Sequence, residues 1–157
     1  MAATAVSGDV CQARAIAAPT VAVQAVLGSL TMPGMPDHVS EARAMVTKAL
    51  GDLHPRLDDA VLMVSELVTN AIVHSNSRQP GGTVTVTVLE SADGVRVEVA
   101  DCGSELSTPM VRADRCAADG HGLFLVQSLA DQWGYLRSEA GATVWFRLAR
   151  ASPAGLS

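Results

Sequence analysis

The residues that could perform chemistry are concentrated in three short stretches, of which the first contains a carboxylate and an amide. Glu66 and Asn70 stand four residues apart in a segment of helical character. Side chains at that spacing project from one face of a helix. Asn70 offers a carbonyl oxygen to a hard cation, and Glu66 could accept a proton from a group that attacks a phosphate. The pair is compatible with magnesium-assisted phosphoryl transfer, but also with simple bridging at a helix surface.

The second stretch is an acid at the end of an apolar strand. Asp101 follows alternating valines and precedes Cys102 and Gly103. A carboxylate in this place can accept a hydrogen bond from the exocyclic amino group of adenine, and Gly103 would let a ring approach the backbone closely. The alternative is a turn aspartate that satisfies nearby backbone amides.

The third stretch is a glycine turn that opens an apolar helix. Gly120, His121 and Gly122 stand immediately before Leu123 and further apolar residues. The free N–H groups at a helix start form a ready anion site. Many helices begin after glycines, so this turn gains its meaning from the other two stretches. Together they predict a site for a magnesium nucleotide.

Composition limits the classes of protein to which the chain can belong. It has 157 residues, 48% of them hydrophobic and 17% charged, which is typical of one globular domain. The net charge is −5 and Lys48 is the single lysine, so a nucleic-acid surface or a polybasic membrane patch is not expected. Residues 1–30 lack the basic start and apolar block of a signal peptide. Three cysteines without metal-ligand spacing favour reduced thiols and a cytoplasmic location.

The apolar periodicity predicts the elements that must position these residues. The expected order is a strand over 21–32, helices over 37–50 and 55–75, a β-hairpin with strands over 83–90 and 95–99, a loop over 102–119, a helix over 123–133 and a strand over 142–149. This order predicts an α+β fold, a two-layer sandwich with a mixed, mostly antiparallel sheet and helices on one face. Trp133 and Trp145 are expected to anchor its core.

The domain is expected to occupy residues 20–150. Residues 1–19 are rich in small residues without a clear period, which indicates a flexible N-terminal extension. Residues 151–157 are expected to form a disordered tail. The loop over 102–119 is long for a compact domain, and such loops usually serve as lids.

The three stretches, in this order, resemble the GHKL ATPase superfamily, which includes gyrase and the histidine kinases. Within it they are most similar to the small anti-sigma factor serine kinases of bacteria. The resemblance covers about residues 30–149 and rests on four motifs: an N box, Ser65-Glu66-Leu67-Val68-Thr69-Asn70-Ala71-Ile72-Val73-His74-Ser75; a G1 box, Asp101-Cys102-Gly103; a G2 box, Gly120-His121-Gly122-Leu123; and a closing strand, Gly141-Ala142-Thr143-Val144-Trp145-Phe146.

The resemblance implies a Bergerat-type fold that binds ATP with Mg²⁺. Asn70 would coordinate magnesium, and Glu66 would act as the general base. Asp101 would hold adenine, assisted by Gly103 and Thr143. The G2 box (Gly120, His121, Gly122 and Leu123) would hold the phosphates, and residues 104–119 would form the ATP lid. The resemblance further implies a homodimer that binds a sigma factor and phosphorylates a serine of an anti-anti-sigma partner.

Two departures from the family pattern keep a second function open. Cys102 stands where the family more often has a polar or small residue. Arg112 and Arg115 are the only cations of the expected lid, and neither directly precedes the G2 box. The alternative is a nucleotide-sensing binding module that sequesters a transcription-factor partner without kinase activity.

Overall fold

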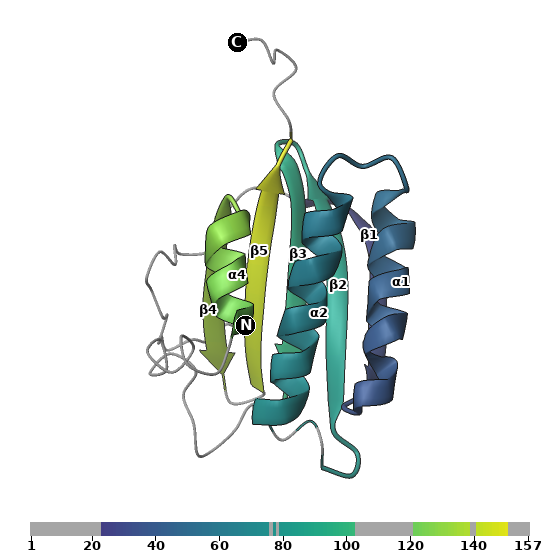
Figure 1. Ribbon diagram of the computed structural model, residues 1–157, viewed down its shortest axis with the longest axis vertical. Coiled ribbons are helices and arrows are strands. Elements are labelled where there is room, and N and C mark those ends of the chain that lie inside the picture. Colours follow the sequence, from purple (N-terminus) through teal and green to yellow (C-terminus); the bar gives the residue numbers. More distant parts are fainter. Residues whose placement is uncertain (1–22, 76, 78, 103–120, 139–140, 151–157) are drawn as a thin grey trace.

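A computed structural model describes residues 23–75, 77, 79–102, 121–138 and 141–150. The regular elements, shown in Figure 1, are β1 (Val23–Pro33), a 3-10 turn η1 (Pro36–His38), α1 (Val39–Leu50), α2 (Leu57–His74), β2 (Thr83–Ser91), β3 (Gly94–Asp101), α4 (His121–Leu129), β4 (Gln132–Ser138) and β5 (Gly141–Ala149). Within these residues no helix is long and apolar enough to cross a membrane.

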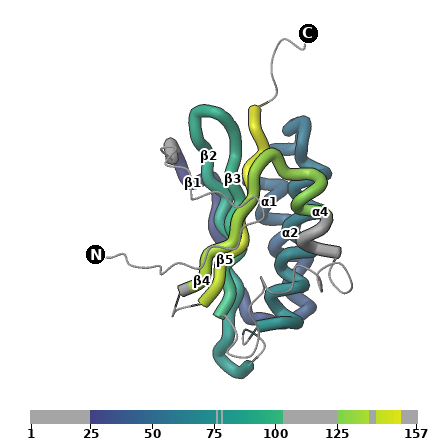
Figure 2. Tube along the Cα trace, turned by 90° about the vertical axis from the view of Figure 1, so that its left-hand side faces the viewer, coloured from purple at the N-terminus to yellow at the C-terminus, as the bar shows by residue number. Residues whose placement is uncertain are grey.

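The strands form one sheet in the order β1-β2-β3-β5-β4. Every neighbouring pair is antiparallel. Figure 2 shows α1, α2 and α4 gathered on one side of this sheet. The predicted two-layer α+β sandwich is therefore confirmed, and the paired strands are antiparallel throughout.

Alternation along the strands separates the two faces of the sheet. Three valines of β2 and three of β3 are buried toward the helices: Val84, Val86, Val88, Val95, Val97 and Val99. The threonines between the β2 valines lie on the opposite face. There Thr85 is 2.8 Å from the hydroxyl of Thr31, and Thr87 is 3.3 Å from that of Ser29. A period of two in the sequence thus sets which side chains can reach the helix layer.

The predicted helix over 123–133 is wrong in its last four residues, 130–133. The helix α4 ends at Leu129, and after two residues the chain forms β4, which carries Trp133. Trp133 pairs with Phe146 of β5 and is buried in the core. A short apolar run fits a helix and a strand equally well by period, and here pairing with β5 decides between them.

Both tryptophans are buried, as predicted, but on different faces. Trp133 packs in the core between the sheet and the helices. Trp145 lies in register with Glu98 on the opposite face, is 1% exposed, and has the guanidinium of Arg96 4.3 Å from its ring centre. The expected N-terminal extension (1–19), lid (104–119) and tail (151–157) lie outside the described residues.

Candidate functional site

The helix α2 places Glu66 and Asn70 at the border of its buried face. Its core-facing residues are Ala60, Met63, Val64, Leu67, Val68, Ala71 and Ile72. Glu66 and Asn70 are both partly exposed and one helical turn apart. Buried residues therefore fix the helix, while these two polar side chains remain accessible at its side.

The side of α2 that carries this pair faces α4. Asp59 precedes Glu66 by two helical turns and so shares its side of the helix. Asp59 accepts a hydrogen bond from Arg56, whose guanidinium also reaches the last residue of α4, Leu129. The other side of α2 packs against α1, where an open groove of about 470 Å³ contains none of the predicted site residues. The groove is lined by Arg43, Thr47, Leu57, Asp58, Val61, Leu62 and Ser65.

Asp101 belongs to the helix-covered face of the sheet. It continues the row of buried valines along β3, two residues beyond Val99. Its partner across the ladder is Ala142 of β5, which is buried. The helix α2 packs on β3. Asp101 is therefore the last residue of β3 on the face of the sheet that α2 covers. This is the same side of the sheet on which Glu66 and Asn70 lie.

Thr143 is not brought together with Asp101. It pairs with Ala100, and successive residues of a strand point to opposite faces. Thr143 therefore shares the outer face with Trp145, away from the helix layer. The expectation that Thr143 assists Asp101 fails for this reason, and Ala142 occupies the position opposite the acid.

Two serines tie the end of α2 to the neighbouring loop: Ser75, the last residue of the N box, and Ser77, which no motif includes. The hydroxyl of Ser75 donates a hydrogen bond to the carbonyl of Ala71 at 2.6 Å. It also accepts one from the backbone N–H of Ser77 at 2.9 Å. Ser75, the residue after α2, is thus held against the last turn of the helix through Ala71, which directly follows Asn70.

Ser77 extends this connection to the strands. Its buried hydroxyl donates to the carbonyl of Thr83 at 2.8 Å and accepts from the backbone N–H of Cys102 at 3.0 Å. Cys102 directly follows Asp101, so the hydroxyl links the acid's backbone to the start of β2 and the end of α2. Serines after a helix signal a turn, but nothing local in the sequence indicates the partner 25 residues away.

Two glycines allow the close approach that this arrangement needs. A Cβ atom on Gly141 would collide with the carbonyl oxygen of Asp101, and Gly141 has a φ of 150° that favours glycine. A Cβ atom on Gly34 would collide with the carbonyl oxygen of Ser77. Both glycines therefore lie so close to the backbone around the candidate site that no side chain would fit between.

The helix α4 supplies the remaining part of the site. Its first turn contains His121, Gly122 and Leu123, whose leading N–H groups lack partners within the helix. In Figure 1 this turn, the end of β3 and the last turns of α2 all lie in the lower half of the view. Gly103 and Gly120 lie outside the described residues.

The donor set suits magnesium rather than a metal that needs several protein ligands. Among the described residues, no group of three or more His, Cys, Asp or Glu side chains could hold a metal ion. Asn70 offers one amide oxygen beside the carboxylate of Glu66. Magnesium binds through few protein oxygens and completes its shell with water and substrate phosphates, so these residues fit it when a nucleotide is present.

Comparison with known proteins places the chain in a class. The family model of the histidine kinase-like ATPase domain matches residues 32–148, so the chain belongs to this family. It is also similar to curated proteins named serine-protein kinase RsbW. It is 28% identical to that of Bacillus velezensis and 26% to that of Bacillus subtilis, each over 129 residues, 73% of this chain and 80% of the relative. The protein of this name from Listeria monocytogenes is 26% identical over 117 residues, 66% of this chain and 74% of the relative.

Proposed function

We propose that this protein binds ATP with magnesium and transfers its γ-phosphate to a serine of a partner protein, as an anti-sigma factor kinase. The observation that carries the proposal is the convergence of three elements on one side of the sheet. Glu66 and Asn70 lie on the side of α2 that faces α4. Asp101 is the last residue of β3 on the sheet face that α2 covers, and the first turn of α4 lies at the same end of the sandwich as Asp101. The family match and the similarity to serine-protein kinase RsbW support it.

Each part of the site has a separate role in nucleotide binding. Asp101 would accept the exocyclic amino group of adenine, with Gly103 leaving room for the ring. The phosphates would bind the first turn of α4, where Gly120, His121, Gly122 and Leu123 supply backbone N–H groups. Asn70 would hold magnesium through its amide oxygen. When bound, magnesium would offset the negative charge of the phosphates.

The chemical step assigned to this chain is proton acceptance by Glu66. The serine hydroxyl of the partner would attack the γ-phosphorus in line, forming a new O–P bond as the bond to the β-phosphate oxygen breaks. Glu66 would take the hydroxyl proton, and ADP would leave with the bonding electrons. Glu66 needs partial exposure to meet a serine from outside, and the structure leaves it partly exposed.

The partners follow from the proposed class. The phosphorylated serine would belong to an anti-anti-sigma protein, and a sigma factor would be the second partner, bound by a homodimer of this chain. The rival function is a nucleotide-sensing regulator that sequesters a transcription factor without transferring phosphate. The scarcity of cations in residues 104–119, with Arg112 and Arg115 alone, favours that rival because fewer charges would stabilise a migrating phosphoryl group.

The test compares the wild type with Glu66→Gln in the presence of labelled ATP, magnesium and a candidate anti-anti-sigma protein. The proposal expects label on the partner, a rate reduced about 10²–10⁴-fold in Glu66→Gln, and ATP affinity nearly unchanged. Thr69→Ala is the matched control, because Thr69 is exposed on the same helix and outside the proposed site. Its rate should equal that of the wild type.

Nucleotide binding is tested separately from transfer. Asn70→Ala should weaken binding of ATP with magnesium, and Asp101→Asn should weaken binding of adenosine as well as ATP. If both variants bind as the wild type does, the proposed site is wrong. If the wild type and Glu66→Gln retain ATP and neither ever labels a partner, the rival regulator is correct.

A further inference from the structure

Arg56 occupies a position at which it is poorly suited to its own helix. It is the N-cap residue of α2, and its side chain makes no capping hydrogen bond. A cation at a helix N-terminus opposes the helix dipole, and an arginine offers no acceptor for the free N–H groups there. One of its side-chain contacts stays in the first turn of α2, with Asp59, and the other two lie outside the helix.

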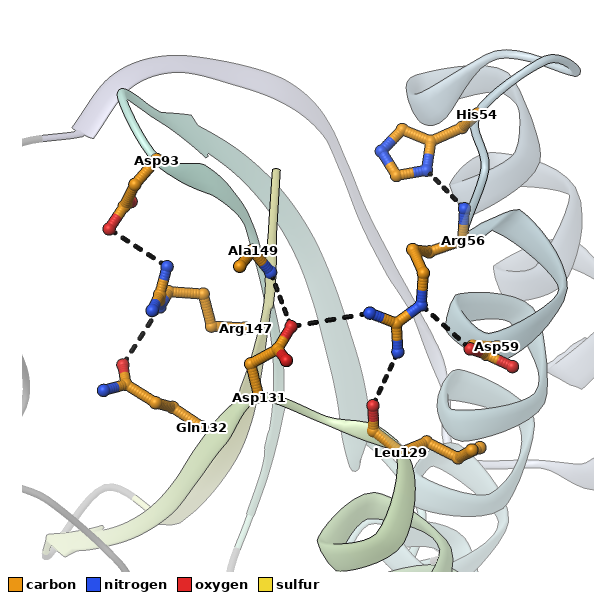
Figure 3. A network of polar contacts seen from close by, with 9 residues as sticks. All are labelled: His54, Arg56, Asp59, Asp93, Leu129, Asp131, Gln132, Arg147 and Ala149. Atoms are coloured by element: carbon orange, nitrogen blue, oxygen red, sulfur yellow. Dashed lines mark hydrogen bonds and ion pairs between the residues drawn. The ribbon is translucent and has the colours of Figure 1, made fainter. Parts of the chain in front are cut away.

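The guanidinium group of Arg56 reaches across to α4, as Figure 3 shows. Its Nη2 donates a hydrogen bond to the carbonyl of Leu129 at 2.6 Å. Its Nη1 is 3.5 Å from Oδ2 of Asp131, and its Nε donates to Oδ2 of Asp59 at 3.0 Å. The first two contacts hold the C-terminal end of α4 and the residues that follow it, whereas the third stays within α2.

Asp131 connects the same cluster to the sheet. Its Oδ2 accepts a hydrogen bond from the backbone N–H of Ala149 at 2.7 Å, and its own N–H donates to the carbonyl of Arg147 at 3.0 Å. Arg56 is therefore the side chain through which the start of α2, the end of α4 and the end of β5 meet (Figure 3).

The contact with Leu129 is the shortest of the three. The last carbonyls of a helix have no partner within it and form the negative end of its dipole. The charged guanidinium, which donates to Leu129 at 2.6 Å, gives a free carbonyl a hydrogen-bond donor and places a positive charge at the negative end of the dipole. The side chain of Arg56 is 28% exposed, whereas those of Asp59 and Asp131 are 36% and 42% exposed, so solvent screens the two ion pairs more.

We propose that Arg56 is a positioning residue for nucleotide binding. This inference rests on the proposed function, because it assumes that phosphates bind the first turn of α4. The backbone hydrogen bonds of α4 make it stiff along its 9 residues, so holding its C-terminal end against α2 fixes where its first turn stands relative to Glu66 and Asn70. Arg56 itself is remote from the ligand, since Asn70 lies about 20 Å farther along α2 at 1.5 Å per residue.

The proposal separates two parts of the nucleotide. The adenine would contact Asp101 at the end of β3, and that strand is held by ladders on both sides and by Ser77 rather than by Arg56. The phosphates would contact α4. Loss of the Arg56 contacts should therefore weaken phosphate recognition and leave adenine recognition intact, which a general loss of stability would not do.

The experiment measures binding of Mg-ATP and of adenosine to Arg56→Gln by calorimetry, at a temperature where circular dichroism shows every variant folded. We expect ATP to bind about fivefold to tenfold more weakly, within the range known for remote coupling, and adenosine to change less than twofold. Asp59→Ala is the matched control, because it removes only the contact within α2. It should change both affinities less than twofold. If Arg56→Gln does not fold, Asp131→Asn should show a smaller loss in the same direction.

Three results would overturn the inference alone: an unchanged ATP affinity in Arg56→Gln (or in Asp131→Asn, if that variant is the one measured), an equal loss for adenosine and ATP, or the same selective loss in Asp59→Ala. A wild-type protein that binds no ATP would overturn the proposed function and the inference with it. Failure of the positioning role is thereby distinguished from failure of the site.

Discussion

Replacing Ser77 by alanine tests whether the connection between α2 and the end of β3 is as important as its geometry indicates. The Ser77 side chain is 1% exposed, and its hydroxyl makes hydrogen bonds of 2.8 Å to Thr83 and 3.0 Å from Cys102. Alanine fits the same space, so the substitution removes the hydroxyl without creating a clash.

The expected loss follows from the two hydrogen bonds. Each contributes about 1 kcal/mol, so the loss of both should lower the free energy of unfolding of Ser77→Ala by about 2 kcal/mol. For a chain of this size, about 2–4 °C per kcal/mol predicts a melting temperature lower by about 4–8 °C. Because Cys102 follows Asp101, adenosine affinity should fall as well.

Urea denaturation monitored by circular dichroism measures the effect, with an unchanged m value as the sign that only stability has changed. Ser29→Ala is the control, because its hydroxyl is 3.3 Å from that of Thr87 on an exposed part of the sheet. It should lose no more than about 0.5 kcal/mol. A similarly small loss for Ser77→Ala, or equal losses for the two variants, would refute the reasoning.

Three further predictions follow from the structure. Gly141→Ala should cost more stability than Gly81→Ala: both glycines have a positive φ, but a Cβ on Gly141 would meet the carbonyl of Asp101 whereas one on Gly81 would meet nothing within 4 Å; equal melting temperatures would contradict this. Burial and the nearby charge of Arg56 lower the pKa of His54 below its ordinary 6.5, so NMR titration should find it below that value, and Arg56→Gln should raise it; a pKa at or above 6.5 in the wild type would be the contrary result. Because the folded state disfavours protonated His54, its contribution to stability is present above pH 6.5 and is lost as pH falls through the folded-state pKa. Unfolding of His54→Gln measured across this range should therefore show a weaker decline toward acid than the wild type, and an identical decline would contradict the assignment.

The hairpin and the central helix could be predicted from the sequence because each has a sustained pattern. The β2 valines alternate with threonines, and α2 repeats apolar residues at helical spacing for five turns of chain (18 residues). Because one face of each element must be buried, only one assignment of helix or strand agrees with each pattern. The segment around Trp133 has no such length, so only its pairing with Phe146 could assign it to a strand.

The candidate site was predictable only in part for the same reason. Motif order predicts Glu66, Asn70 and Asp101 as site residues, and their neighbours in sequence fix the helix and the strand that carry them. The resemblance groups Thr143 with Asp101 because the two motifs belong together in the family, but the register of β3 and β5 places Ala142 opposite the acid. A shift of one residue along a strand reverses the face, and the register is set by partners distant in sequence.

The sequence by itself determined the class of protein, the elements of the central sandwich and the helix pair Glu66 and Asn70, because periodicity and short motifs are local properties of the chain. Only the tertiary structure decided which faces meet. It brought Ser77 to Cys102, seated Arg56 on the end of α4 and turned Thr143 away from Asp101. Those contacts join residues 25 or more positions apart or depend on strand register, and no local pattern encodes them.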